Sequence, residues 1–550
     1  MARNWKKWLS TALATSVIVA ALAGCSTGKN ENKNAGTSTS ETTQTTTNEG
    51  QAGSQDPYAK YRPIEGKKYT FTWTAGQLAP ADPDGEMTLY WEEKWGVDLD
   101  IWNIDSAQWD EIMNMKFASG EIPDKIRINS FTTLQKYYNQ DLLAEIPEDV
   151  LKYFAPTLYE IHTTEVPGAL NYGKINGKLY AIPDYSISGN FRSPTVWRGD
   201  WLKNVGIEKT PETLEEFEAA MYAFAKNDPD GNGKNDTYGL STTGLWSVYG
   251  AYGYLPDRWS DKDGKLVYGA VQPEMKEALA KLAQWYKDGV IDPEFITGEN
   301  KGGYFAISHA FVNGRIGYSS LGAYYHWRPK MSDTDADVIG QNIQEMQKVN
   351  PDMIQHLVHG QPPVGPTGKN GVPQSAIVSG VFDSIGKHLE EEPDKLGKLL
   401  TMFEDLVSSF DNFIIARQGI EGKHWEWQND MPVRVGIYTD GKELSKIGAM
   451  PIMTIFTPYQ YESKLLPLRV QFAQEMGMDK GGIRNELLTT LESQAKYWTE
   501  LEKLREETYI SIIIGDKPVD YFDEFVEKWY KSGGSQVEAE ANAWYQGVEK

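Results

Sequence analysis

The stretch Asp228–Gly239 reads DPDGNGKNDTYG and follows a segment with the apolar spacing of a helix. Its oxygen-bearing side chains stand at alternate positions, as they do in the calcium-binding loop of an EF-hand. Gly233 falls at the position where such a loop turns sharply. The pattern predicts a Ca²⁺ site with ligands at loop positions one, three, five, seven (a backbone carbonyl) and nine, which are Asp228, Asp230, Asn232, Lys234 and Asp236.

The loop departs from a complete EF-hand at its last position. An EF-hand closes with a bidentate Glu at position twelve, and Gly239 stands at that position in this sequence. The alternative interpretation is a polar turn of Asp, Asn and Gly residues that ends the helix without binding a metal. The match of five ligand positions in register favours the metal site.

The size and charge of the chain limit its architecture and its partners. Its 550 residues are too many for one hydrophobic core and predict two or more lobes. An apolar content of 40% is sufficient for ordinary globular cores. A formal net charge of −23 argues against nucleic acid as a partner, because nucleic-acid binding needs basic surfaces.

The N-terminus has the layout of a secretory signal, in which basic residues precede an uncharged stretch from Trp8 to Gly28. The sequence LAGC at 22–25 resembles a bacterial lipobox, whose cysteine is diacylated and becomes the new N-terminus. We therefore expect a signal peptide over 1–24 and a lipid anchor on Cys25, the only cysteine of the chain. An uncleaved membrane helix and a cysteine placed there by chance are the alternatives.

The segment after the cysteine is poor in apolar residues. Residues 26–56 are mostly Ser, Thr, Asn, Gly and Glu, and we expect a flexible tether over 25–60 with a reach of about 30 Å. No later segment approaches about eighteen consecutive apolar residues, so no further membrane-spanning helix is expected. The sequence predicts a protein held by its lipid at the outer face of the cell membrane.

Strand-like and helix-like segments alternate after the tether. Strands are predicted at 68–75, 97–101 and 126–128, and helices at 87–95, 109–118, 275–286 and 399–410. The segment 175–183 is expected to hold a turn at Asn176–Gly177 and then a strand. A further helix is expected to begin at Thr210–Pro211 and to lead into the calcium-type loop. The last clear helix is expected over 518–532, with Gly533–Gly534 as its stop. Alternation of this kind predicts an α/β fold with mostly parallel sheets.

Aromatic residues are unusually frequent, with 18 Trp and 30 Tyr. Most are expected in hydrophobic cores, and those in or beside loops are candidates to line a ligand groove, since flat apolar rings suit pyranose faces. Asn129 is a further candidate because it directly follows a short strand. The aromatic candidates are Trp73, Trp102, Trp246, Tyr249, Trp259, Tyr324, Tyr325, Trp327, Trp425 and Trp427.

Motifs for common enzymatic chemistries are missing from the sequence. It contains no nucleotide-binding glycine loop, no HExxH, no CxxC pair and no GxSxG elbow. His356 and His359 stand three apart without a third partner at a telling spacing, so we expect them to be ordinary surface or loop residues. Paired carboxylates of a glycosidase cannot be identified from sequence alone. A binding protein is therefore favoured, and a surface-anchored glycan-degrading enzyme stays open.

Several segments resemble one family over nearly the whole chain after the tether. The longest runs from Trp197 to Leu240 (WRGDWLKNVGIEKTPETLEEFEAAMYAFAKNDPDGNGKNDTYGL), and others are ASGEIPD (118–124), NGKLYAIP (176–183), FVNGRIGY (311–318), GIEGKHWEW (419–427) and IIIGDKPVDYFDEFVEKWYKSGG (512–534). With LAGC, they are similar to the lipoprotein extracellular solute-binding proteins (family 1) of bacterial ABC transporters, and to the alginate- and oligosaccharide-binding subgroup in particular.

The resemblance implies a two-lobed fold of the type II periplasmic-binding-protein kind, with the ligand in a cleft between the lobes. It implies a structural Ca²⁺ at the loop, although Thr237 stands where those members have an acidic residue. The implied partners are an oligosaccharide and the permease subunits of an ABC transporter. The implied state of assembly is a monomer. A peptide-binding lipoprotein is the other alternative. The expected boundaries are 61–185 and 366–450 for the first lobe, 186–365 for the second, and 451–550 for a helical part that belongs mostly to the second.

Overall fold

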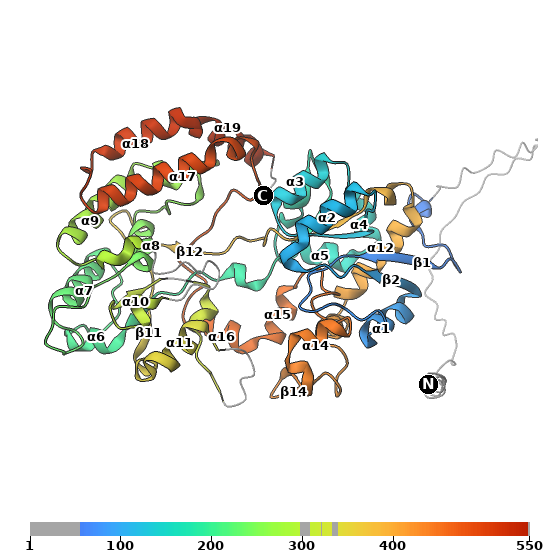
Figure 1. The fold of residues 1–550 in the computed structure, drawn as a ribbon, viewed down its shortest axis with the longest axis horizontal. Coiled ribbons are helices and arrows are strands. Elements are labelled where there is room, and N and C mark those ends of the chain that lie inside the picture. Colours follow the sequence, from blue (N-terminus) through green and yellow to red (C-terminus); the bar gives the residue numbers. More distant parts are fainter. Residues whose placement is uncertain (1–55, 298–307, 321, 333–338, 548–550) are drawn as a thin grey trace, which may run out of the picture. The chain divides into compact units, whose positions relative to one another are not determined.

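The computed structural model describes residues 56–297, 308–320, 322–332 and 339–547. These residues belong to one unit, Asp56–Lys550, which contains two large hydrophobic cores. We call the part around the core of Phe71 and Trp73 the first lobe, and the part around the core of Phe217 and Trp285 the second lobe (Figure 1).

The first lobe is built on a five-stranded sheet with the order β2-β1-β3-β13-β6. Its strands are β1 (Tyr69–Trp73), β2 (Val97–Ile101), β3 (Lys125–Ile128), β6 (Ala181–Pro183) and β13 (Phe382–Ile385). β1 pairs in parallel with β2 and β3, whereas β13 runs antiparallel to β3 and to β6. Four strands share one direction and β13 opposes them, so the mostly parallel sheet is confirmed for this lobe.

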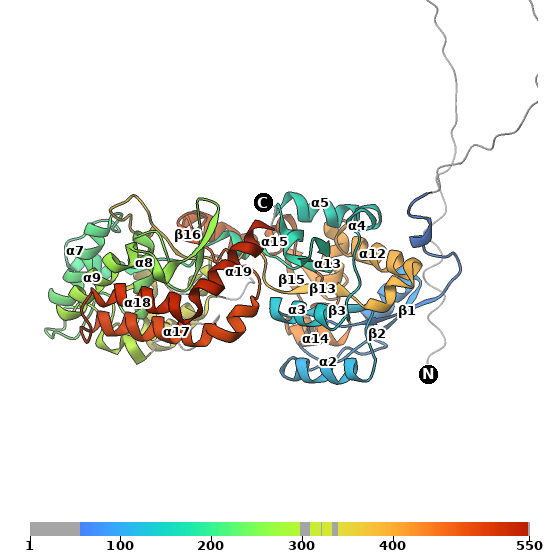
Figure 2. The ribbon, with the colours of Figure 1, turned by 90° about the horizontal axis from the view of Figure 1, so that it is seen from above.

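Helices cover both faces of this sheet, as Figure 2 shows. Phe71 and Trp73 of β1 are buried against one set of helices, and Ile126 and Ile128 of β3 are buried against the other. The first set is α1 (Glu86–Trp95), α4 (Glu148–Phe154), α5 (Pro156–Thr164) and α12 (Pro393–Val407), and the second is α2 (Trp109–Ala118) and α3 (Phe131–Asn139). The alternation of strand side chains between the two faces gives each face an apolar surface to cover.

Smaller elements complete the first lobe. The turn predicted at Asn176–Gly177 joins β4 (Lys174–Ile175) to β5 (Lys178–Leu179). After α12 the chain forms α13 (Phe410–Gln418), a hairpin of β14 (Trp425–Gln428) and β15 (Met431–Arg434), α14 (Gly441–Lys446) and α15 (Tyr459–Leu465).

The second lobe is mainly helical. Its longer helices are α7 (Leu214–Lys226), α8 (Thr242–Ala251), α9 (Glu274–Lys287), α11 (Gln341–Val349), α17 (Glu492–Ile513), α18 (Tyr521–Trp529) and α19 (Ser535–Gln546). Shorter elements are α6 (Gly199–Asn204), α10 (His309–Val312) and the hairpin of β8 (Trp259–Lys262) and β9 (Lys265–Tyr268). Residues of α7, α9, α17, α18 and α19 meet in one core.

The sheet of the second lobe differs from the prediction. β7 (Val196–Arg198) lies between β10 (Tyr318–Ser319) and β11 (Leu357–His359), and it runs antiparallel to both. Single parallel bridges join Tyr238 to Ile316, Leu240 to Ile291 and Thr213 to Val364. Because these strands are only two or three residues long, the sequence alternation that predicted a parallel sheet could not determine their direction.

The predicted start of α7 was three residues too early. The helix begins at Leu214, and Thr213 caps it: the Glu216 backbone N–H donates to the Thr213 hydroxyl, and the Thr213 N–H donates to the Glu216 carboxylate, both at 3.2 Å. The Leu214 N–H is held by the Val364 carbonyl at 2.9 Å. Thr213 and Glu216 form a capping box, which outweighs the Thr210–Pro211 signal.

The glycine stop predicted after α18 coincides with a kink between two helices. Tyr530–Gly534 forms a π-helical turn that connects α18 directly to α19. Gly533 has a φ of 119°, so the helix kinks there and resumes at Ser535. A side chain at Gly533 would meet the Tyr497 ring of α17 at 2.3 Å, so the glycine permits a close approach of two helices.

Within the described residues the chain passes between the two lobes at three places (Figure 1). The first follows β6 and leads to β7. The second leads from β12 (Val372–Pro373), which pairs with β16 (Gly482–Ile483), to β13. The third joins α15 to α16 (Pro467–Glu475). Segments of these crossings and their neighbours pack in a small core of their own, which includes Phe191, Tyr324 and Phe472.

Candidate functional site

The carboxyl ends of the first-lobe strands meet at one edge of the sheet, next to the first crossing. β1 ends at Trp73 and is followed by Thr74, β3 is followed by Asn129, and β6 is followed by Asp184. In open α/β sheets, ligands bind outside the carboxyl ends of the strands. This edge is therefore the place where the fold itself positions a ligand site.

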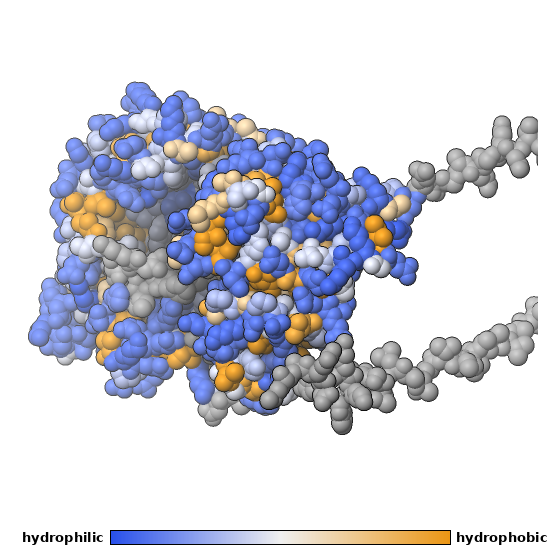
Figure 3. All heavy atoms as spheres, turned by 45° about the vertical axis from the view of Figure 1, so that its right-hand side comes forward, coloured by the Kyte–Doolittle hydropathy of each residue, from blue (hydrophilic) through white to orange (hydrophobic). Residues whose placement is uncertain are grey.

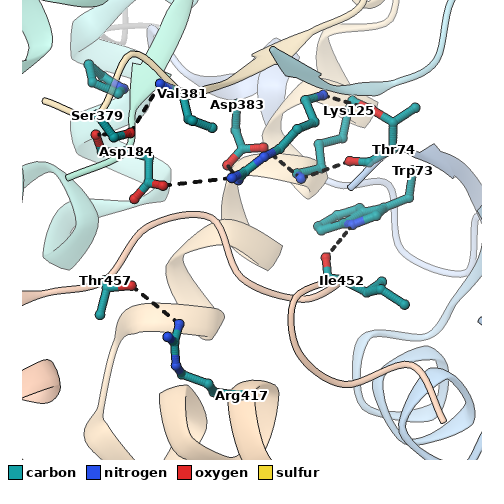
Figure 4. A network of polar contacts seen from close by, with 12 residues as sticks. Trp73, Thr74, Lys125, Asp184, Ser379, Val381, Asp383, Arg417, Ile452 and Thr457 are labelled. Carbon is teal, nitrogen blue, oxygen red and sulfur yellow. Dashed lines mark hydrogen bonds and ion pairs between the residues drawn. The ribbon is translucent and has the colours of Figure 1, made fainter. Parts of the chain in front are cut away.

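A buried ion pair organises this edge (Figure 4). The Lys125 Nζ lies 2.7 Å from the Asp383 carboxylate, and both side chains are fully buried. Lys125 also donates to the Thr74 carbonyl at 3.0 Å and lies 4.9 Å from the centre of the Trp73 ring. Burial lowers the pKa of Lys125, and the Asp383 carboxylate opposes that effect. The pair ties β3, β13 and the end of β1 together.

Arg127 stands between two carboxylates at the same edge. Its guanidinium lies 3.8 Å from Asp184 and 3.8 Å from Asp383. Desolvation raises the pKa of Asp184 to about 7, and Arg127 opposes this shift. The buried Arg127 Nε has no hydrogen-bond partner in the described part of the chain. Because the Arg127 guanidinium has an N–H donor without a partner and lies at a polar edge beside a crossing, it can bind hydroxyl or carboxylate oxygens of a ligand.

A cavity of about 360 Å³, which we call the arginine cavity, opens beside this edge. It is lined from α13, β15, α15 and α16 by Arg417, Gln418, Met431, Pro432, Val433, Arg434, Thr439, Glu462, Leu465, Leu466, Pro467, Leu468 and Arg469. Arg417 donates to the Thr457 hydroxyl at 3.4 Å. Burial lowers the pKa of Arg417, and the Glu462 and Asp184 carboxylates oppose this effect. The charged side chains of the strand edge therefore interact electrostatically with those of the arginine cavity.

A second cavity, which we call the crossing cavity, has a volume of about 170 Å³. It is lined by Ser188, Phe191, Ser193, Arg258, Gly322, Ala323, Tyr324, Tyr325, Pro373, Gln374 and Ser375. The Arg469 guanidinium of the arginine cavity lies 4.7 Å from the centre of the Tyr325 ring. The two cavities are therefore neighbours, and together they form an extended site of arginines, aromatic rings and polar groups. In Figure 3 polar side chains dominate the visible face of the molecule.

The calcium-type loop lies in the second lobe, between α7 and the Tyr238 bridge. The Asn232 side-chain nitrogen lies 2.8 Å from Asp230 and 3.1 Å from Asp236, and the Gly233 N–H donates to Asp228 at 2.9 Å. Partial burial and the Asp228 and Asp236 carboxylates raise the pKa of Asp230. Among the described residues, no three His, Cys, Asp or Glu side chains form a group that could hold a metal. The Asn232 side-chain amide lies between the Asp230 and Asp236 carboxylates.

Two features explain how the loop departs from an EF-hand. The Thr237 hydroxyl is buried and donates to the Phe224 carbonyl in the last turn of α7 at 2.9 Å. It therefore satisfies a carbonyl group at the C-terminal end of this helix. A Cβ at Gly239 would lie 2.8 Å from the Met221 carbonyl oxygen and 2.9 Å from its Cα. No side chain fits at Gly239 without moving the backbone of α7, which accounts for the absence of a glutamate there.

The structure separates most of the predicted aromatic candidates from the two cavities. Trp73, Tyr249, Trp259, Trp327 and Trp425 are buried in hydrophobic cores, and Trp102 is buried beneath the Lys116 ammonium group. Trp246 packs against the second-lobe core, and Trp427 on β14 is 44% exposed. The rings in the cores are enclosed by other side chains, and ligand contact by these residues stays a prediction. Tyr324 and Tyr325 line the crossing cavity.

The two histidines and Asn129 have different settings. His359 is half-buried and packs on Phe472, while burial lowers its pKa to about 4. His356 ends a short helical turn before β11. Asn129 is exposed at the end of β3, directly before the cap of α3.

Sequence reasoning missed the charged residues of the site. Arg127 alternates with buried isoleucines on β3, and Asp184 directly follows the last residue of β6. A charge at the end of a predicted strand was the available signal for both. Arg417 and Arg434 lie on α13 and β15, outside the segments that cross between the lobes. Only the folded structure brings them into the arginine cavity.

Two expectations about the membrane can be compared with the structure only in part. No helix among the described residues is long and apolar enough to cross a membrane. Cys25 and the segment predicted to be a signal peptide, 1–24, lie outside the described residues.

Comparisons with known proteins found relatives in sequence and in structure. Residues 92–344 match the model of the family described as bacterial extracellular solute-binding protein. Two relatives from Bacillus subtilis (strain 168) are each 24% identical. Lipoprotein LipO aligns over 99% of both chains, and the polygalacturonan/rhamnogalacturonan-binding protein YtcQ aligns over 89% of this chain and 93% of its own.

Solved structures share the fold. The alginate-binding protein AlgQ2, in a crystal structure without calcium ion, superposes with a TM-score of 0.56 at 17% identity, over 88% of this chain and 98% of its own. An HMO-binding, ABC-transporter-associated solute-binding protein from Bifidobacterium longum infantis has a TM-score of 0.61 at 13% identity, over 89% of this chain and 100% of its own. The expected two-lobed α/β fold of type II is thus confirmed. The chain is thus similar to bacterial extracellular solute-binding proteins, in one relative over nearly its whole length.

Proposed function

We propose that this protein captures an oligosaccharide at the crossings between its lobes and delivers it to the permease of an ABC transporter. The observation that carries the proposal is the pair of neighbouring cavities, lined by arginines, tyrosines and polar groups, beside the carboxyl ends of the first-lobe strands. Sugar-binding sites need this combination of flat rings for pyranose faces and fixed donors for hydroxyl oxygens.

The two-lobed construction suggests how capture is coupled to delivery. The segments between the lobes, including Ser188–Ser193 and Pro373–Ser375, line the crossing cavity themselves. A ligand bound there contacts the same backbone that would change when the lobes close, so it favours the closed form by its differential affinity. The permease then needs to recognise only the closed form, and empty protein does not compete for it.

Binding without turnover is the central test. The purified protein is titrated with a panel of oligosaccharides and peptides by calorimetry, and the sugars are then checked for chain shortening. We expect stoichiometric binding of a saccharide, recovered intact. Recovery of shortened sugar would replace this proposal by a glycan-degrading enzyme, and binding of peptides alone would replace it by a peptide carrier.

A variant pair locates the site. Tyr325→Ala removes the ring that lies under the Arg469 guanidinium in the crossing cavity and is expected to weaken sugar binding at least tenfold. The matched control is Tyr153→Ala, because Tyr153 is 42% exposed and stacks on Tyr58 at the surface of the first lobe. Equal affinities of the two variants for the sugar would exclude the crossing cavity as the binding site.

The second part of the proposal is a structural Ca²⁺ at Asp228, Asp230, Asn232, the Lys234 carbonyl and Asp236. All of these groups offer oxygen ligands, and a cation would neutralise the carboxylates of Asp228, Asp230 and Asp236, two of which now raise the pKa of the third, Asp230. The Asn232 amide oxygen accepts from the Lys234 N–H at 2.7 Å, and a rotation of this amide would turn the oxygen toward the carboxylates. The residues of the loop therefore fit a hard cation.

The expected role of the ion is to fix the end of α7 to the bridge at Tyr238. Chelation should lower the melting temperature of the protein and leave its affinity for sugar nearly unchanged. Asp228→Asn with Asp230→Asn should abolish the response to chelator, while Asp516→Asn at an exposed position should not. Loss of sugar binding on chelation, without any change in melting temperature, would contradict a structural role.

The third part concerns the anchor and the state of assembly. We propose that a lipid on Cys25 holds a monomer at the outer face of the membrane, and that a signal peptide over 1–24 is removed. Cys25→Ser should move the protein from the membrane fraction to the medium and abolish labelling with radioactive palmitate. Labelling of the variant at the level of the natural protein would refute the assignment.

A further inference from the structure

The first crossing contains a fully buried arginine that no carboxylate neutralises. Arg192 has no exposed surface, and within the described residues it forms no ion pair with a carboxylate. Burial lowers the pKa of Arg192 to about 10, so the guanidinium stays charged at neutral pH. Buried charges are normally paired, because an unpaired charge in a protein interior is costly. The filling of space alone does not explain a guanidinium at this position.

The Arg192 guanidinium binds neutral acceptors in three different segments. Its Nε donates to the Lys480 carbonyl at 2.7 Å, and its Nη1 donates to the Ser193 carbonyl at 2.8 Å. Its Nη2 donates to the Gly360 carbonyl and to the Gln361 side-chain oxygen, both at 3.1 Å. These acceptors lie in the first crossing, in the loop after β11 and in the loop between α16 and β16. A planar fork with several N–H donors can reach all of them from one position.

The backbone at Arg192 joins the crossings as well. The Arg192 N–H donates to the Met478 carbonyl, just after α16, at 2.9 Å. Arg192 also forms an antiparallel bridge with Gln374 in the second crossing. The Ser193 N–H donates to the Pro373 carbonyl at 2.7 Å. Side chain and backbone together therefore tie the first crossing to the second and to the segment that continues from the third.

The neighbours of Arg192 form one wall of the crossing cavity, which we call the crossing wall. Phe191 and Ser193 line the cavity from the first crossing, and Pro373 and Gln374 line it from the second. Phe191 has an extended backbone, with φ −117° and ψ 135°. In extended backbone, successive side chains point to opposite sides. Arg192 accordingly is not one of the lining residues of the cavity and supports the crossing wall from behind.

Resting on the function proposed above, we infer that Arg192 is a positioning residue for saccharide binding. It holds the crossing wall in its binding geometry before the sugar arrives, and it does not touch the sugar itself. Without the guanidinium, the joined segments would keep only their backbone bonds, and the sugar would have to order the crossing wall as it binds. That ordering costs conformational entropy and would appear as lost affinity. An apolar side chain of similar size would fill the space but would join none of these segments.

Hydrogen–deuterium exchange on the full-length protein without sugar tests the first step of the inference. Arg192→Met keeps much of the side-chain volume and removes every donor. The amides at positions 192, 193 and 374 donate to the carbonyls of Met478, Pro373 and Ile483. We expect these three amides to exchange about ten times faster or more in the variant, while the amides of β1 in the first lobe exchange as before.

Calorimetry tests the second step. The probes are maltotriose, kestose and trigalacturonate, each titrated well below the melting temperature of every variant. Arg192→Met should weaken the binding of any probe that the natural protein binds by about tenfold or more. Arg192→Lys should recover part of this loss, because an ammonium group can donate to some of the same carbonyls but lacks the fork.

Arg198→Met is the control that separates positioning from a general loss of stability. Arg198 is another buried arginine, on β7, and its Nε donates to the Asp200 carboxylate at 2.8 Å. It does not line the crossing cavity. We expect this variant to lower the melting temperature and to leave the affinity for the probes nearly unchanged.

The outcomes separate this inference from the proposed function. Unchanged amide exchange in Arg192→Met, unchanged affinity, or an equal loss of affinity in Arg198→Met would overturn the positioning role and leave oligosaccharide binding in place. If Arg192→Met does not fold, Arg192→Lys is judged by the same two measurements. If the natural protein binds no saccharide, the proposed function and the positioning role fall together.

Discussion

Lys125 and Asp383 offer a quantitative test of how the ligand-site edge is held together. Both side chains are fully buried, and their charged atoms lie 2.7 Å apart. Neither Asp383 oxygen has a hydrogen-bond partner of good geometry among the described residues, so the aspartate depends on nearby cations. Replacing Lys125 by Met would leave a buried carboxylate facing only Arg127, at 3.8 Å.

The size of the effect follows from this arrangement. Removing one member of a buried ion pair destabilises a protein by about 3–5 kcal/mol, because the other charge remains desolvated. Arg127 still offsets part of the Asp383 charge, so Lys125→Met should lower the free energy of unfolding of the first lobe by about 3 kcal/mol, at the low end of this range. Adding Asp383→Val removes the stranded charge with a side chain of similar volume and should recover about 2 kcal/mol.

Urea denaturation followed by tryptophan fluorescence measures these differences, since Trp73 lies 4.9 Å from the Lys125 ammonium group. Lys68→Met is the control, because Lys68 is 72% exposed and pairs with Asp98 at the surface. Its effect should stay within about 0.5 kcal/mol. A loss below about 1 kcal/mol for Lys125→Met, or a double variant less stable than the single one, would refute the reasoning.

Three other predictions concern particular side chains. The pKa of Asp184 in the folded protein is about 7, above the value of about 3.9 for an unfolded aspartate. The folded state therefore holds the proton more tightly, and the free energy of unfolding should fall as the pH rises from about 4 to about 7. Asp184→Asn should flatten this decline and raise stability at pH 8, and an unchanged pH profile would contradict the assignment. Gly239→Glu should lower the melting temperature without raising calcium affinity, because the new side chain collides with the Met221 backbone; tighter calcium binding would show that the loop accepts a twelfth-position ligand. Trp425→Ala should cost about 3–5 kcal/mol in urea titrations, whereas Trp427→Ala, 44% exposed, should cost below about 1 kcal/mol, and equal losses would contradict their different burial.

Local patterns predicted much of the fold. The apolar alternation of β1 and β2 and the helical spacing of α1, α2 and α9 identified these elements to within one or two residues. The errors arose where a tertiary contact decided the outcome. The start of α7, for example, is fixed by Val364, about 150 positions away.

The site was harder to predict than the fold for a physical reason. A tryptophan beside a predicted loop can be as deeply buried as one in a strand, and Trp259 and Trp327 show that loop proximity does not indicate exposure. Tyr324 and Tyr325 line a cavity, and nothing in their local sequence separates them from Trp327, two positions further on. The arginines of the site act together only after α13, β15 and α16 have packed.

The position of β13 has a consequence for the order in which the chain can fold during export. β13 lies between β3 and β6 and supplies the pairing partner of both, yet Phe382 follows Pro183 by 199 positions. When the chain emerges from the membrane N-terminus first, β6 has no neighbour in the sheet until the first part of the second lobe has also emerged. The nascent first lobe then exposes two unpaired strand edges, which are open to wrong pairing. We expect the second lobe to fold while the first waits, and the first lobe to complete its sheet only once β13 is available.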